Sequence, residues 1–449
     1  MISSNPQLSK VDVIKNLGFS TLLRRLRSLS WLSFLSGIVL VFGFLREIVV
    51  ARQFGVSQEL DVFIAVFGVY MFLGLQVGNT LEMTIISKWE RIPDIDDRRK
   101  LLSSVIVQLG LMMVVAAAIV LALFGDGFSL LFPDLSVSHA GTAMKIMQGL
   151  AIGILFSSMA GLLRGVLNTQ RIFMPGIIGG AVISLTSILS MFVWSQSQGI
   201  YALVIGIITG NAVLLAWYAL LLVKNGILRL SWQGMNLLIV RPFWMAVLIV
   251  LIGELLFQVY GMGQRSIASH FETGTISAFY YASSIMLVPL ALVVMPLLTT
   301  VYPKLAAILS TDRVAGVRLL LKYAALLLVF STVVATLLAL FAKDLIALVF
   351  VGGAFSVQAA EKTGEIMSVL CASLPFIAIT RLAMYALYSI ADYVTPVIGN
   401  LVSVVVLLLL AWIAVPVYGV IGLAASIVAA SGAATLFKLS VLVWRLRCG

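Results

Sequence analysis

Segments of about twenty apolar residues, each able to cross a ~30 Å hydrocarbon core as a helix, recur along the whole 449-residue chain. Because lipid offers no hydrogen-bond partners, the backbone of such segments must satisfy itself as α-helix. Only 10% of the residues are charged, against roughly 25% in soluble domains. The sequence therefore predicts an all-α polytopic membrane protein with about twelve transmembrane helices. The polar breaks place these spans near 30–53, 61–87, 101–124, 142–165, 172–195, 200–223, 240–264, 276–300, 318–342, 363–389, 394–415 and 419–444.

Lysines and arginines are distributed unevenly between the two sides that these spans define. Of the 29 basic residues, 23 fall on the side of the N-terminus and six on the other. This positive-inside asymmetry predicts that both termini lie in the cytoplasm and that residues 1–28 form a cytoplasmic tail. A nucleic-acid-binding protein would instead gather its charge on one folded face. We therefore interpret the net charge of +11 as a topology signal and expect no nucleic-acid partner.

The chain repeats weakly at an offset of about 220 residues. Residues 165–175 align with 386–396, each a short turn that leads to a proline, and 199–203 align with 419–423. An offset of six spans gives both halves the same orientation, as in transporters built from parallel repeats. We expect an N-lobe at 29–224, a linker at 225–240 and a C-lobe at 241–449, arranged as two six-helix lobes around a central cavity. The alternative is a chance resemblance between apolar helices.

Catalytic and cofactor motifs are missing from the sequence. It contains neither a phosphate-binding Gly-x-x-x-x-Gly-Lys loop nor a His-Glu-x-x-His zinc motif. Its two cysteines and two histidines form no metal-ligand pattern. The acidic cluster at 94–97 lies in a basic loop and is interpreted as solvated. These observations favour a transporter without a cofactor over an enzyme.

The seventh predicted span carries the strongest indication of a binding site. Glu254 lies near the middle of this span, where a carboxylate is costly unless it faces protein or water. At about 100° per residue, Gln258, Gly261 and Arg265 share its helical face. This stripe favours a water-filled, substrate-binding cavity. The alternative is that Glu254 hydrogen-bonds to another helix while Arg265 snorkels to the interface.

Further ionisable residues are candidates for the same cavity. Arg46 and Glu47 lie in the outer part of the first span, and Lys145 lies near the outer end of the fourth. Arg46 could equally snorkel to the interface. Asp61 opens the second span, where it could serve only as a helix N-cap. Arg381 is placed at the cytoplasmic end of the tenth span, where a structural role is expected because helix C-termini favour cations.

Residues 43–47 (Gly-Phe-Leu-Arg-Glu), 51–55 (Ala-Arg-Gln-Phe-Gly) and 61–63 (Asp-Val-Phe) resemble the first-span signature of the lipid II flippase family, the MviN group. Residues 279–282 (Phe-Tyr-Tyr-Ala) resemble the eighth span of that family. The family belongs to a superfamily of multidrug and oligosaccharidyl-lipid exporters. The resemblance implies a bacterial inner-membrane protein with two lobes that alternate between inward- and outward-open states. It also implies a lipid-linked saccharide as substrate, contact with membrane lipids and a functional monomer.

The chain departs from the family pattern at several cationic positions. Val39-Leu40 and Gly74-Leu75 stand where the family has arginines, and Ser283-Ser284 stand where it has Asp-Arg. Arg265 is the candidate replacement for a lost charge. The family also commonly has two further C-terminal spans that are not expected among these twelve. A cargo such as an exopolysaccharide or capsule unit therefore fits better than lipid II itself.

Energy coupling is a further implication of the resemblance. It implies a sodium site in the second lobe, for which Asp392 is the candidate ligand. Proton coupling is the alternative. The main rival function is a proton- or sodium-coupled drug or metabolite antiporter of the same superfamily, in which Glu254 would be the coupling acid.

Overall fold

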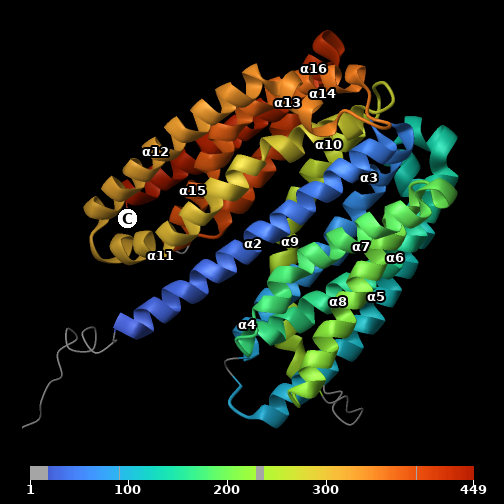
Figure 1. Ribbon diagram of the computed structural model, residues 1–449. Helices are drawn as coiled ribbons and strands as arrows, with labels where there is room; N and C mark the ends of the chain where they lie inside the picture. The colour runs from blue at the N-terminus through green and yellow to red at the C-terminus, as the bar shows by residue number, and fades with distance from the viewer. Residues whose placement is uncertain (1–18, 90–91, 229–236, 391, 449) are drawn as a thin grey trace, which may run out of the picture.

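The computed structural model describes residues 19–448 except 90–91, 229–236 and 391, and these residues are almost entirely α-helical (Figure 1). Most of the expected N-terminal tail and of the expected linker lies outside the described residues. The tail prediction was wrong about where the first helix begins, because the described chain is helical from Phe19 rather than from residue 30. In chain order the elements are α2 (Phe19–Phe54), α3 (Gln58–Tyr70), the π-helix η1 (Met71–Gln76), α4 (Val77–Trp89), α5 (Ile95–Leu131), α6 (Pro133–Thr169), α7 (Met174–Gln198), α8 (Tyr201–Lys224), α9 (Leu237–Ala268), α10 (Thr275–Met286), the π-helix η3 (Leu290–Val294), α11 (Met295–Thr311), α12 (Arg313–Leu340), α13 (Ala342–Phe350), α14 (Val357–Leu370), the 3-10 turn η4 (Cys371–Ser373), α15 (Leu374–Ser389) and α16 (Val394–Cys448).

The expected membrane spans agree with these helices. Nine helical segments of the described residues are long and apolar enough to cross a membrane, and the last of them, Val394–Leu446, contains the eleventh and twelfth expected spans. The first and seventh expected spans coincide with α2 and α9. Several spans combine two helices in line, such as α3 with α4 and α10 with α11, because a π-helical turn interrupts the α-helical register. The short helix α13 was not foreseen.

The weak sequence repeat has a structural counterpart at offsets close to 220 residues. Gly199 separates α7 from α8 with φ 54° and ψ −131°, and Gly419 breaks α16 with φ 55° and ψ −133°. This positive φ is accessible to glycine at little cost, so both sharp turns require that residue. The π-helices η1 and η3 likewise occupy corresponding spans. The two halves thus share local geometry as well as span number.

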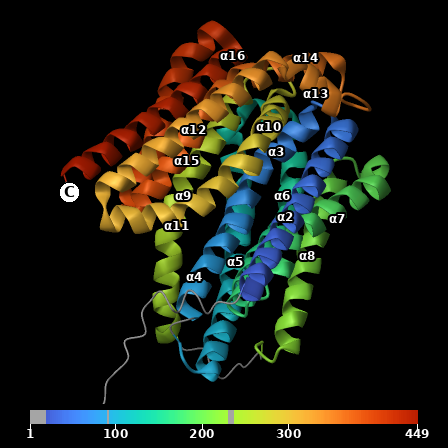
Figure 2. The ribbon, with the colours of Figure 1, turned by 60° about the vertical axis from the view of Figure 1, so that its left-hand side comes forward.

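The helices form two lobes that meet at one end. In the N-lobe α6 packs against α4, α5 and α8, and in the C-lobe α15 packs against α12 and α16. The ribbons of the two lobes approach each other around α3, α10 and α13 and spread apart toward α4 and α11 (Figure 2). Helix α9 contacts both lobes, since it packs against α16 and against α3, α4 and α5. We call the region around α3 and α10 the joined end.

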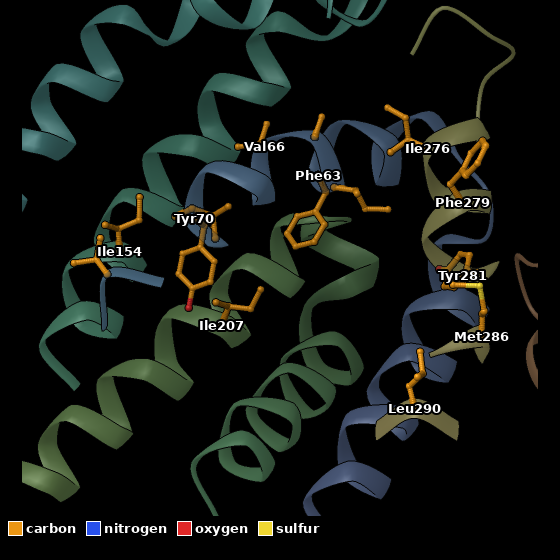
Figure 3. Close-up of a cluster of buried hydrophobic side chains, with 14 of the residues drawn as sticks. Phe63, Val66, Tyr70, Ile154, Ile207, Ile276, Phe279, Tyr281, Met286 and Leu290 are labelled. Atoms are coloured by element: carbon orange, nitrogen blue, oxygen red, sulfur yellow. The ribbon is translucent and has the colours of Figure 1, made fainter. Parts of the chain in front are cut away.

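Apolar packing continues across the joined end. Phe63 of α3 and Ile276 and Phe279 of α10 belong to one buried cluster (Figure 3). On the N-lobe side the same cluster reaches Tyr70, whose hydroxyl accepts a hydrogen bond from Asn211 of α8 at 2.9 Å. The polar groups described next are therefore held in a well-packed apolar frame.

Candidate functional site between the lobes

Asp61 joins the two lobes by capping a helix of the opposite lobe. Its carboxylate accepts hydrogen bonds from the backbone N–H of Gly274 and of Ser277, both at 2.6 Å, and from the Ser277 hydroxyl. These groups form the N-terminus of α10, where the helix dipole also favours a negative charge. The alternative that Asp61 caps its own helix was wrong, because Ser57 is the N-cap of α3.

Glu47 forms a second polar connection between the lobes. Its side chain bonds to Arg46 of the same helix, with the Arg46 Nε to Glu47 Oε1 distance at 3.1 Å. The other carboxylate oxygen accepts the hydroxyl of Tyr280, on α10, at 2.7 Å. Glu47 is only 8% exposed, so these partners are needed to compensate its lost hydration. Arg46 is consequently neutralised by Glu47 rather than free for an anion.

Arg265 lies in a different electrostatic situation, on α9 close to the same tyrosine. Its Nη1 atom is buried and has no hydrogen-bond partner among the described residues. The guanidinium lies over Gly68 of α3, where a Cβ atom would overlap Nη1. Arg265, Gln264, Tyr280 and Ser283 line a cavity of about 140 Å³ between the lobes. A buried guanidinium nitrogen without a partner is costly, which makes this position suited to an anionic ligand.

The predicted stripe on α9 divides between two surroundings. Gly261 and Arg265 line the inter-lobe cavity, whereas Glu254 and Gln258 are not among its lining residues and are half-buried. The charged group that acts on Glu254 is Arg381 of α15, within the C-lobe. Lys145 is exposed on α6, and no printed hydrogen bond or ion pair joins it to the Arg46–Glu47 pair within the described parts of the chain. The structure therefore brings together Arg46, Glu47 and Arg265, and places the other candidates elsewhere.

Asp392 lies at the N-terminus of α16, outside the membrane-spanning segments. One carboxylate oxygen accepts the backbone N–H of Val394 at 3.2 Å and of Thr395 at 3.0 Å. The other accepts the Thr395 hydroxyl at 2.7 Å and lies 3.5 Å from Arg445 Nε. Burial alone would raise the pKa of Asp392, but the hydrogen bonds from Thr395, the charge of Arg445 and the bond from Val394 lower this pKa overall. The arrangement is that of a helix cap.

Sequence reasoning missed a further ionic cluster between α4 and α6. Arg164 Nε donates to Glu82 Oε2 at 2.7 Å, Arg164 Nη2 donates to Asn79 at 2.8 Å, and Asn168 donates to Glu82 Oε1 at 2.7 Å. Glu82 is a carboxylate within an apolar span, which was a usable signal. Tyr280 and Gln264 gave no signal, because tyrosine and glutamine are common near span ends. The placement of Arg381 at the end of the tenth span was wrong, since α15 continues to Ser389.

Two helical lobes, joined at one end around a partly cationic cavity, define a membrane transporter of the alternating-access kind. The family described as "Lipid II flippase MurJ" matches residues 50–448. The chain belongs to this family, so it is a transporter and not an enzyme, and a multi-pass protein of the bacterial inner membrane. This outcome confirms the resemblance seen in the sequence.

Individual relatives agree with this assignment. A probable lipid II flippase MurJ of Vibrio cholerae is 24% identical over 406 residues, which cover 86% of this chain and 76% of the relative. One from Synechocystis is 23% identical over 437 residues, which cover 90% of this chain and 78% of the relative. A structure of lipid II flippase MurJ in an inward closed conformation superposes with a TM-score of 0.80 at 20% identity, covering 92% of this chain and 87% of that one. An inward-facing multidrug transporter of the MATE family superposes with a TM-score of 0.77 at 13% identity, covering 92% and 98%.

Proposed function

We propose that the chain is a flippase that moves a polyprenyl-diphosphate-linked saccharide across the cytoplasmic membrane by alternating access. The observation that carries this proposal is Arg265, whose buried Nη1 faces the inter-lobe cavity without a partner. Together Arg46, Glu47 and Arg265 leave one net positive charge at this site. A diphosphate could engage Arg265 through charge-assisted hydrogen bonds, while its prenyl tail stays in the surrounding lipid.

The orientation of the chain belongs to the same proposal. The excess of basic residues on the N-terminal side supports a cytoplasmic location for both termini. The joined end would then lie on the outer side, so the lobes of this state would be separated toward the cytoplasm. Such a state would receive a lipid-linked saccharide where it is synthesised. We further propose that a single chain is the functional unit.

The proposal is tested by transport of a fluorescent polyprenyl-diphosphate disaccharide in proteoliposomes. We expect Arg265→Ala to lower the rate about 10- to 100-fold, because a hydrogen bond to a charged group contributes roughly 1.5–3 kcal/mol. Arg265→Lys should restore only part of the rate, since an ammonium cannot form the bidentate contact. The matched control is Lys145→Ala, which removes an exposed cation and should leave the rate unchanged. A normal rate in folded Arg265→Ala would refute the diphosphate site.

The rival function is a proton- or sodium-coupled antiporter of drugs or metabolites. The fold similarity to MATE transporters and the half-buried carboxylate of Glu254 support it. This function predicts extrusion of a cationic dye by the same proteoliposomes, with loss of ion dependence in Glu254→Gln. Dye extrusion without movement of the labelled lipid would favour the antiporter over the flippase.

A further inference from the structure

The C-lobe contains a buried lysine that the transport site does not use. Lys438 lies in the second half of α16 and is only 2% exposed. Its Nζ donates a hydrogen bond to the Asn400 side-chain oxygen at 3.0 Å, across to the first half of the same long element. The stem of the lysine lies directly on Gly399, where a Cβ atom would overlap the Lys438 Cε. The packing at residue 399 thus leaves space for this side chain.

Charge around Lys438 comes from the neighbouring helices. Arg381 of α15 acts on Lys438 as a like charge and acts on Glu254 of α9 as an opposite charge. No salt bridge to Lys438 is printed among the described residues; the printed partner is the neutral amide of Asn400. A charged group inside a membrane-spanning lobe is expensive and is a functional hypothesis by default. Lys438 therefore requires an explanation beyond packing.

The residues of this lobe do not fit the sodium site that the family resemblance implies. Asp392, the candidate ligand, has both carboxylate oxygens engaged in capping α16 and facing Arg445. A hard cation such as sodium needs several oxygen ligands around an open position. Among the described residues there is also no group of three or more acidic, histidine or cysteine side chains that could hold a metal ion. The interior of the lobe is instead entered by the Lys438 side chain.

The equivalent position of the N-lobe shows that the space itself is an old feature of the repeat. Residue 438 corresponds to Tyr218 at the offset of 220, and residue 399 corresponds to Gly179. A Cβ atom at Gly179 would meet the Tyr218 hydroxyl, which bonds to the backbone oxygen of Pro175 at 3.0 Å. A long side chain thus lies over a glycine in both lobes, but only the C-lobe residue is an amine.

We propose that the ammonium group of Lys438 is a tethered cation of the C-lobe, which takes the place of a dissociable metal ion there. The lobe then carries its positive charge through the whole transport cycle, and neither its stability nor its conformational equilibrium requires sodium. The inference concerns energy coupling, and it stands whether or not the cargo is a lipid-linked saccharide.

The first test compares the purified wild-type protein in equimolar sodium, potassium and choline chloride. A ligand that binds only the folded state raises the melting temperature, so we expect no sodium-specific rise. Spin labels at Glu59 and Glu361, exposed residues on the two lobes, report the distance between the lobes, and this distribution should not change with the cation. A sodium-specific shift in either measurement would overturn the proposal. Neither readout needs a cargo, so failure here is distinct from failure of the proposed flippase function.

The second test removes the charge while keeping the length of the side chain. We expect Lys438→Met to change the ratio of the two lobe distances about tenfold, and Lys438→Arg to preserve it more closely. Lys322→Met, at an exposed lysine of α12, is the matched control. Wild-type distances in folded Lys438→Met would show that the cation is not needed there and would refute the proposal. If Lys438→Met does not fold, the sodium comparison on the wild-type protein still decides the question.

Discussion

Asp61 is the side chain whose removal should most directly separate the lobes at the joined end. Its carboxylate accepts three hydrogen bonds from Gly274 and Ser277, and it is 2% exposed. Asp61→Ala deletes all three bonds and leaves the N-terminus of α10 without its cap. The bonds exist only while the lobes are in contact, so their loss destabilises this state and spares any state in which the lobes are apart at this end.

The magnitude follows from the type of bond. A hydrogen bond to a charged acceptor contributes roughly 1.5–3 kcal/mol, but three bonds that share one carboxylate are not additive. Water also re-solvates the freed N–H groups once the end opens. We therefore expect a net loss of about 2–4 kcal/mol, which lowers the population ratio of joined to separated states about 30- to 700-fold. Asp61→Asn keeps one acceptor oxygen and should give a smaller change.

The measurement is the distance between spin labels at Glu59 on α3 and Glu361 on α14, with Cys371 and Cys448 replaced by alanine. We expect a single short distance in the wild-type background and a second, longer distance in Asp61→Ala. Ser57→Ala is the control, because it removes the N-cap of α3 within one lobe and no inter-lobe hydrogen bond of that side chain. If folded Asp61→Ala keeps the wild-type distribution, the carboxylate does not hold the lobes together.

Three other perturbations test separate parts of the structure. Gly68→Ala should lower diphosphate binding about tenfold or more with little change in melting temperature, because the new methyl group displaces only the flexible end of Arg265; unchanged binding would contradict the cavity geometry. Asp392→Asn should lower stability by about 1 kcal/mol at neutral pH. Because the folded pKa of Asp392 is depressed, the wild-type advantage should be complete above the unfolded value of about 3.9 and disappear as the pH falls through the folded value; an equal difference between the two proteins at all pH values would be evidence against the cap. A cysteine at Gln198 should react with an impermeant reagent from outside intact cells and one at Asp96 should not, since the charge asymmetry predicts that orientation; the reverse labelling would invert the topology.

The helices and their number were predictable from the sequence because the membrane imposes one dominant rule. A lipid-exposed backbone must be helical, and apolar segments separated by polar breaks therefore locate the spans. The same rule says nothing about register within a span. The π-helices η1 and η3 and the break at Gly419 arise from packing between helices, and hydropathy alone does not report them.

The candidate site was only partly predictable. Arg46, Glu47 and Arg265 were recognisable because ionisable groups are rare inside spans, and the structure brings them together near Tyr280. Which charge is compensated depends on contacts between residues more than 200 positions apart, as between Glu47 and Tyr280. A single sequence does not encode such contacts in a readable pattern. The same limitation hid the burial of Lys438, which was counted among the basic residues of the cytoplasmic side.

The two lobes share a framework but differ in the side chains placed on it, and this difference is where function can diverge. Gly179 and Gly399 each receive a long side chain from a later helix, yet one is Tyr218 and the other Lys438. Near the joined end, Asp61 bonds to Ser277, a residue of the corresponding span in the other lobe. Matching positions that carry unlike groups make the contact between lobes complementary rather than self-repelling, because two aspartates there would oppose each other. A repeat of this kind can therefore close at one end through asymmetric pairs while keeping a separate charge pattern inside each lobe.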